Sequence, residues 1–437
     1  NNVFARSAAV LAAIILTMPV HARAQEARQS VAISVTQAAQ LLMENGRYDE
    51  ARTLLDRELQ AKPDDSETLF LLANLDVAQK DYAGAIARFR RILAREPDAE
   101  RVRLELARAF FLDGDYDNAD RQFRFARAGD IPDTVKDNID KFLSAITRLR
   151  QWQGDVSLAL APDTNQNTGT AASQVIVFGL PFVLDPNARR QSGVGIAGGI
   201  NGEWSPLLWD NVKLRMGGDL SRLDYSGGHF DDMTASAYAG PQFLYSNWDF
   251  SILATGFDRW YGNRPYLAGA GGKIAAEVGI LSDLLVGGSV GAQDVRDHLI
   301  PQQNGPLYSA QAQAIYVLSP SRLIQLQGGF NRQEAQIAPY SYSGIWFGAG
   351  YQQDLSLGFS AGFQPSYYIT HYDAALAAFG VTRNDNAVML SFSLLNRRLD
   401  YHGFTPRLSY VFTDQHSNIP LYSYTRSQIQ LGLTSLF

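Results

Sequence analysis

The chain has 437 residues, 46% of them hydrophobic, and a formal net charge of -6 at pH 7. Its length predicts more than one domain, its acidic balance argues against a nucleic-acid partner, and its lack of cysteine excludes disulfides, thiolate metal sites and a cysteine-linked lipid anchor on this chain. A mean hydropathy of -0.16, with no apolar run beyond the N-terminus approaching the ~18–20 residues needed, excludes a helical membrane protein.

The beginning of the chain has the order of an export signal. Arg6 supplies a positive n-region, residues 8–20 form an apolar stretch too short to span a bilayer, and residues 22–24 (Ala-Arg-Ala) are a small-x-small cleavage sequence. A short buried helix is the alternative, but it does not explain this order. We therefore expect residues 1–24 to be a signal peptide.

Residues 31–150 are expected to form helices that repeat. Positions of the same type recur at intervals of 34 residues: Tyr48, Tyr82 and Tyr116; Ala51, Ala85 and Ala119; Leu55, Phe89 and Phe123; Pro63 and Pro97. The small alanines let paired helices approach, and the prolines end the second helix of a pair. This period with these residue types resembles the tetratricopeptide repeat (TPR). Three repeats are predicted, followed by a capping helix over residues 134–149, with one apolar stripe and one charged face.

From residue 151 onward the hydrophobic period changes to two, which predicts strands. Gln325 and Gln327, for example, alternate with Leu326 and Phe330. In a membrane barrel one face meets lipid and the other lines a lumen. Fourteen strands are predicted, over residues 153–163, 193–205, 208–223, 232–245, 248–260, 267–281, 284–297, 306–318, 322–334, 342–353, 356–370, 385–397, 404–413 and 424–437.

The predicted connections alternate between short and long, as in outer-membrane barrels. Residues 205–207 are short, whereas residues 164–192, 261–266 and 371–384 are expected to be longer loops. An even strand number leaves both ends of the barrel, and hence the helical array, in the periplasm. A soluble β-sandwich, the alternative, would not require this alternation. The loop over residues 164–192 is apolar enough to fold inward or to contact a partner.

The final strand ends in Phe437. Ile429, Leu431 and Leu433 lie on one face of this strand, opposite polar and small residues. It resembles the last strand of bacterial outer-membrane barrels, in which the terminal Phe acts as an assembly signal. The expected fold class is therefore a two-domain chain, an α-solenoid followed by a transmembrane antiparallel β-barrel over residues 151–437, with outer-membrane lipid and the barrel assembly machinery as partners.

Three segments carry a resemblance that covers nearly the whole mature chain. They are the junction over residues 131–152, the first strand and its exit over residues 157–169, which contain an Asp-x-Asn-x-Asn sequence, and the end over residues 401–437. Together with the domain order, they resemble the surface lipoprotein assembly modulator (Slam) family. The resemblance implies an outer-membrane protein that assists a surface lipoprotein or a secreted soluble protein to the cell surface, with a periplasmic chaperone as a further partner.

TPR arrays present a concave face that binds extended segments of other proteins. The alternative for any one residue of this face is ordinary solvation or packing between repeats. On the register of the family, the candidate client-binding groove consists of Gln40, Asn74 and Arg108, with Phe70, Arg101 and Phe111 nearby.

We expect no enzymatic activity, because no motif supports a catalytic, cofactor or metal site. Residues 269–273 (GAGGK) lack the spacing of a phosphate-binding loop. The histidines form no metal pattern, and the adjacent His416 and Ser417 are not placed as a nucleophile–base pair. Two other functions are kept as alternatives: an exopolysaccharide exporter, and a porin that carries the TPR array as a scaffold.

Overall fold

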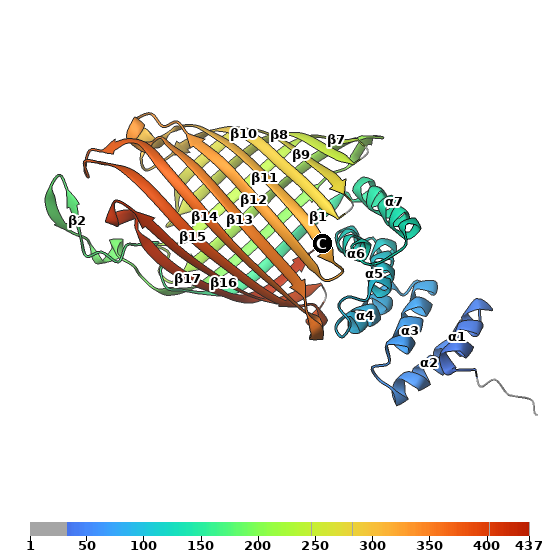
Figure 1. The fold of residues 1–437 in the computed structure, drawn as a ribbon. Helices are drawn as coiled ribbons and strands as arrows, with labels where there is room; N and C mark the ends of the chain where they lie inside the picture. The colour runs from blue at the N-terminus through green and yellow to red at the C-terminus, as the bar shows by residue number, and fades with distance from the viewer. Residues whose placement is uncertain (1–32, 246, 282, 402, 437) are drawn as a thin grey trace, which may run out of the picture.

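A computed structural model describes residues 33–245, 247–281, 283–401 and 403–436. The expected signal peptide, residues 1–24, and Phe437 lie outside the described residues. Figure 1 shows two parts, a helical array and a β-barrel, with the array at one end of the barrel. Within the described ranges, no helix is long and apolar enough to cross a membrane.

The described part of the array consists of α1 (Val35–Glu44), α2 (Tyr48–Ala61), α3 (Ser66–Ala78), α4 (Tyr82–Leu93), α5 (Glu100–Asp113), α6 (Tyr116–Arg127) and α7 (Asp133–Leu149). The side chain of Asp65 caps α3 by accepting a hydrogen bond from the Thr68 amide at 2.8 Å. Gly114, in the left-handed region at φ 87°, ends α5.

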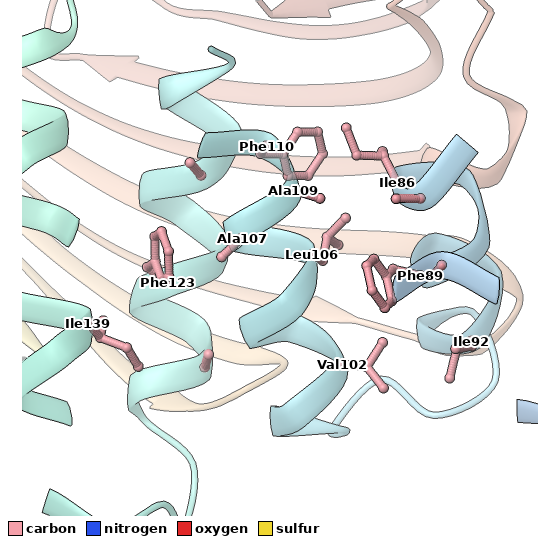
Figure 2. Packing of buried hydrophobic residues seen from close by; sticks show 14 of the residues in the cluster. Ile86, Phe89, Ile92, Val102, Leu106, Ala107, Ala109, Phe110, Phe123 and Ile139 are labelled. Atoms are coloured by element: carbon pink, nitrogen blue, oxygen red, sulfur yellow. The ribbon is translucent and has the colours of Figure 1, made fainter. Parts of the chain in front are cut away.

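The repeat positions predicted from the sequence form the core of the array. Ala51, Ala85 and Ala119 are fully buried, and so are the larger Leu55, Phe89 and Phe123. Figure 2 shows Phe89 and Phe123 on either side of α5, which contributes Val102, Leu106 and Phe110. Ile139 extends this cluster to α7, as a capping helix should.

Fourteen strands close into a ring in which each pairs antiparallel with its neighbours. The predicted strand number and fold class are therefore confirmed. The ring consists of β1 (Trp152–Asp163), β4 (Gly193–Trp204), β6 (Val212–Tyr225), β7 (Asp232–Tyr245), β8 (Trp248–Tyr261), β9 (Arg264–Leu281), β10 (Leu284–Asp297), β11 (Gly305–Ser319), β12 (Arg322–Gln333), β13 (Tyr342–Asp354), β14 (Phe359–Leu376), β15 (Val381–Asn396), β16 (Phe404–Ser417) and β17 (Tyr424–Leu436).

Two short additions lie outside the ring. β5 (Leu207–Trp209) pairs with the start of β6. β2 (Gln174–Val177) and β3 (Leu180–Val183) form a separate hairpin in the connection between β1 and β4. Figure 1 shows this hairpin beyond the end of the barrel that is opposite the array. We call the two ends of the barrel the array end and the loop end.

Two loop predictions were wrong. Residues 261–266 contain only a tight turn at Gly262 and Asn263, both at positive φ, between β8 and β9. Residues 371–384 are mostly strand, because β14 continues to Leu376 and β15 begins at Val381. These strands extend past the region in which one face meets lipid, so the period-two signal disappears although the ladder continues.

Candidate functional site

The array is fixed to the barrel by a buried ion pair. Arg103 on α5, with 2% of its side chain exposed, donates to the Asp354 carboxylate at the end of β13 at 2.9 Å. Arg103 also donates to the carbonyl oxygen of Pro97 and to the Gln122 side chain. Burial lowers the pKa of Arg103, whereas the carboxylate of Asp354 acts in the opposite direction. The Arg103–Asp354 pair therefore fixes the position of α5 relative to the end of β13.

Further contacts continue around the same end of the barrel. Ser321 in the β11–β12 turn donates to Asp98 at 2.5 Å, and the Leu357 amide in the β13–β14 turn donates to the Ala94 carbonyl. On the opposite side of the ring, the Lys213 ammonium donates to the carbonyl oxygens at the end of α7. Because these contacts involve several turns of the ring, the array is docked against one mouth of the barrel (Figure 1).

The predicted alternation places polar side chains inside the barrel and apolar ones outside. Leu326, Phe330 and Leu431 are exposed on the outer wall. Near the array end, the lumen contains a cavity of about 390 Å³ lined by charged and amide side chains, including Glu203, Arg215, Lys273, Glu277 and Gln313. A second cavity of about 680 Å³ lies toward the loop end and is lined by residues that include Ser157, Arg259, Arg407, Arg426 and Gln430.

Several charges within the lumen are paired. Arg215 donates to the Glu203 carboxylate at 2.7 Å, and the Tyr238 hydroxyl donates to the same carboxylate at 2.5 Å. Arg259 forms a two-bond pair with Asp232. Together with amides, serines and glycines, these charges make the wall of the lumen polar.

The Asp-x-Asn-x-Asn sequence of the first strand fastens the long β1–β4 connection to the loop end. Asp163 is buried and accepts hydrogen bonds from the Tyr225 hydroxyl at 2.6 Å and from the Arg426 guanidinium at 2.6 Å. Asn165 is fully buried and donates to the carbonyl oxygens of Gly169 and Thr425. The motif was visible in the sequence, but its role as a clamp between β1, β6 and β17 depends on ring closure.

Asn167 and the segment that follows continue along the rim. The Asn167 amide donates to the carbonyl oxygens of Asn187 and Arg189. The Thr170 hydroxyl donates to the Pro420 carbonyl in the β16–β17 connection, and the Phe178 amide donates to the Ala378 carbonyl between β14 and β15. The connection therefore lies on the rim and does not fold inward, and contact with a partner, the other possibility, stays a prediction.

The six groove candidates divide into exposed and packed residues. Gln40, Arg101 and Arg108 are exposed, and Asn74 is partly buried. Phe111 packs edge-on against Phe142 of α7 at 5.1 Å between ring centroids.

Phe70 and Arg101 form one continuous surface. Phe70 packs against Phe89 at 5.8 Å, and the Arg101 guanidinium lies 4.9 Å from the centre of the Phe70 ring. On α5, Arg101 and Arg103 are two residues apart, so they point roughly 200° apart around the helix. The candidate groove therefore faces away from the junction with the barrel.

The family model described as surface lipoprotein assembly modifier matches residues 152–437, and its N-terminal TPR counterpart matches residues 57–123. A general tetratricopeptide repeat model matches residues 34–75.

Curated relatives align with most of this chain. The chain is 22% identical to surface lipoprotein assembly modifier 1 of Haemophilus influenzae, over 83% of this chain and 76% of that protein. It is 24% identical to surface lipoprotein assembly modifier 1 of Neisseria meningitidis, over 86% and 77%. It is 22% identical to the hemophilin secretion modulator of Acinetobacter baumannii, over 83% and 79%.

Among solved structures, the outer membrane channel DcaP of Acinetobacter baumannii covers 65% of this chain and is itself covered to 96%, with 7% identity and a TM-score of 0.41. The type III secretion translocator chaperone SycD of Yersinia enterocolitica covers 26% of this chain and is itself covered to 81%, with 17% identity and a TM-score of 0.25.

Proposed function

The chain belongs to the surface lipoprotein assembly modifier family, and we propose from this premise that it assists the export of a client protein across the outer membrane to the cell surface. The main support for this proposal is the match of the family model to the whole barrel, together with the match of the family's TPR model to residues 57–123 of the array. The chain is an outer-membrane protein, and the proposed arrangement places the array in the periplasm. The proposed role is one of docking and passage, without catalysis.

In this proposal the array engages the client, or a chaperone that carries it, before passage. Three features support the groove as the binding surface. Arg101 and Arg108 supply exposed donors for a client main chain, Phe70 supplies an apolar surface beneath Arg101, and none of these residues is used in the junction with the barrel. The barrel then supplies the exit route, for which a polar lumen is suited.

The test is a comparison of surface-exposed proteins between cells with the chain, cells lacking it and complemented cells. Protease shaving of intact cells should show one or a few exported proteins that lose surface exposure when the chain is absent, while their total amount in the cell persists. An unchanged set of surface proteins would contradict the proposal. A change confined to surface polysaccharide, or to the uptake of small solutes, would instead favour the exporter or porin alternatives.

The groove is tested separately, once the client has been defined in this way. Arg101→Ala combined with Arg108→Ala should reduce client capture by the purified chain by about tenfold or more, as expected for the loss of two charge-assisted hydrogen bonds. Arg148→Ala, which removes an exposed arginine from α7, is the matched control. Equal capture by both variants would exclude the groove as the binding surface.

A further inference from the structure

The β2–β3 hairpin is an apolar surface at the exit of the barrel. Residues 171–184 (AASQVIVFGLPFVL) contain no charged side chain. Ile176, Phe178, Leu180, Phe182 and Val183 have between 58% and 74% of their surface exposed. Single exposed apolar residues are ordinary, but a contiguous exposed cluster of this kind is typical of an interaction site.

The hairpin is held in a fixed place. Phe178 and Gly179 both have positive φ, which is the geometry of a two-residue hairpin turn whose twist matches that of its strands. The backbone bond from Phe178 to Ala378 holds the turn against the β14–β15 connection, and the Thr170 hydroxyl holds the approach to the hairpin against Pro420. The hairpin that carries the exposed cluster is therefore held beyond the loop end of the barrel (Figure 1).

The two outer edges of the hairpin are not equivalent. The Leu184 amide donates to the Ser173 carbonyl, so these two residues form a hydrogen-bonded pair of the hairpin. Because hydrogen-bonded and non-hydrogen-bonded pairs alternate along an antiparallel ladder, Val175 and Val177 are the residues of β2 whose backbone groups bond to β3. Gln174 and Ile176 then direct their amides and carbonyls outward. Among the described residues, no segment outside the hairpin is hydrogen-bonded to the backbone of Gln174 or Ile176.

The corresponding edge of β3 carries Pro181, which is paired with Ile176 and has no N–H to donate. A proline on a strand edge weakens pairing with an incoming strand. Of the two edges, that of β2 is therefore the open one, and it is flanked by the exposed side chains of Ile176 and Phe178.

We propose that the edge of β2 receives an extended segment of the client as it leaves the lumen, by addition of a strand; this inference rests on the proposed export function. Strand addition uses main-chain groups for affinity and needs little sequence identity in the added segment. A client that has not yet folded offers such main-chain groups, whereas lipid acyl chains do not. The apolar side chains next to the edge then contact alternate side chains of the incoming strand.

Because the chain has no cysteine, one introduced cysteine can carry a photo-crosslinker without interference. The client is the protein identified by the surface comparison described above. Ile176→Cys carrying a benzophenone should crosslink to this client during export. Leu299→Cys is the matched control, since Leu299 is a similarly exposed apolar residue (61%) in the β10–β11 connection of the loop end. Crosslinks of Ile176→Cys to lipopolysaccharide or to a second copy of the chain, or equal client crosslinking by both variants, would overturn the inference.

A proline pair tests the edge itself. Ile176→Pro removes an outward N–H from β2 and should slow the appearance of client at the surface by about fivefold, the effect of one main-chain hydrogen bond. Val183→Pro removes an outward N–H from β3 and should leave the rate unchanged. Equal effects, or no effect of either, would refute strand addition at β2. Failure of the wild-type chain to expose any client would instead contradict the proposed function itself.

Discussion

Replacing Asp354 by alanine should loosen the array from the barrel. Asp354 is the common acceptor for Arg103 at 2.9 Å and for Arg121 at 3.5 Å, and its removal leaves Arg103 as a buried charge without an acidic partner. Breaking a buried ion pair from one side costs about 3–5 kcal/mol. Since Arg103 keeps its bonds to Pro97 and Gln122, we expect a cost below this range, of about 2 kcal/mol.

The helical far-ultraviolet signal provides the assay, because the helices belong to the array whereas Asp354 belongs to the barrel. For an array of this size, about 2 kcal/mol corresponds to a fall of about 8 °C in the melting temperature of the helices. Asp373→Ala is the control, since Asp373 pairs with Arg332 toward the loop end.

A second variant separates charge from packing. Arg103→Met combined with Asp354→Leu should melt closer to the wild type than Asp354→Ala does, because an apolar pair avoids the unpaired buried charge. An unchanged melting temperature in Asp354→Ala would refute the assignment of this pair as the anchor.

Three further predictions concern stability. Ala85→Leu should destabilise the array by about 1–3 kcal/mol in chemical denaturation, because the position is fully buried, whereas Ala87→Leu on the exposed face of α4 should have little effect; equal effects would contradict the repeat packing. Hydrogen bonding from Thr68 lowers the pKa of Asp65. The stability that ionised Asp65 gives to the array is therefore present above the unfolded pKa of about 3.9, and it is lost as the pH falls through the lower folded pKa. Asp65→Ala should therefore lower the free energy of unfolding of the array by about 1 kcal/mol at neutral pH. The variant should also lose less stability than the wild type below about pH 4, and an unchanged dependence of stability on pH would contradict this. Asp163→Ala should speed proteolysis within residues 164–192 by about tenfold or more, a change of about 1.4 kcal/mol, and an uncleaved connection would show that other contacts hold it.

The sequence predicted the elements that repeat or alternate, and it failed where neither pattern applies. The buried alanines at 34-residue intervals and the fourteen strands were found because a solenoid and a lipid-facing wall impose those periods. The β2–β3 hairpin was missed as a strand pair because both of its faces are apolar, so it has no alternation. The extensions of β14 and β15 were missed because a strand beyond the bilayer has no face that must be apolar.

Hydrogen-bond partners that are distant in the sequence could not be predicted, for a different reason. Arg103 and Asp354 are 251 residues apart, and Asp163 and Arg426 are 263 apart. Neither pair has a spacing rule, since each is brought together only when the ring closes and the array docks. The sequence identified Asp163 and its neighbours as a motif but could not show that they clamp one connection to the rim.

The direction in which the groove faces bears on any route for the client. Arg101 lies on the opposite side of α5 from the anchor Arg103, so a segment held at Arg101 is separated from the mouth of the barrel by the helix itself. The junction combines the Arg103–Asp354 pair with contacts that Ser321, Leu357 and Lys213 make from other turns of the ring. In the proposed function, transfer from groove to lumen therefore requires the client to pass around the array, or the array to release the Asp354 anchor and turn.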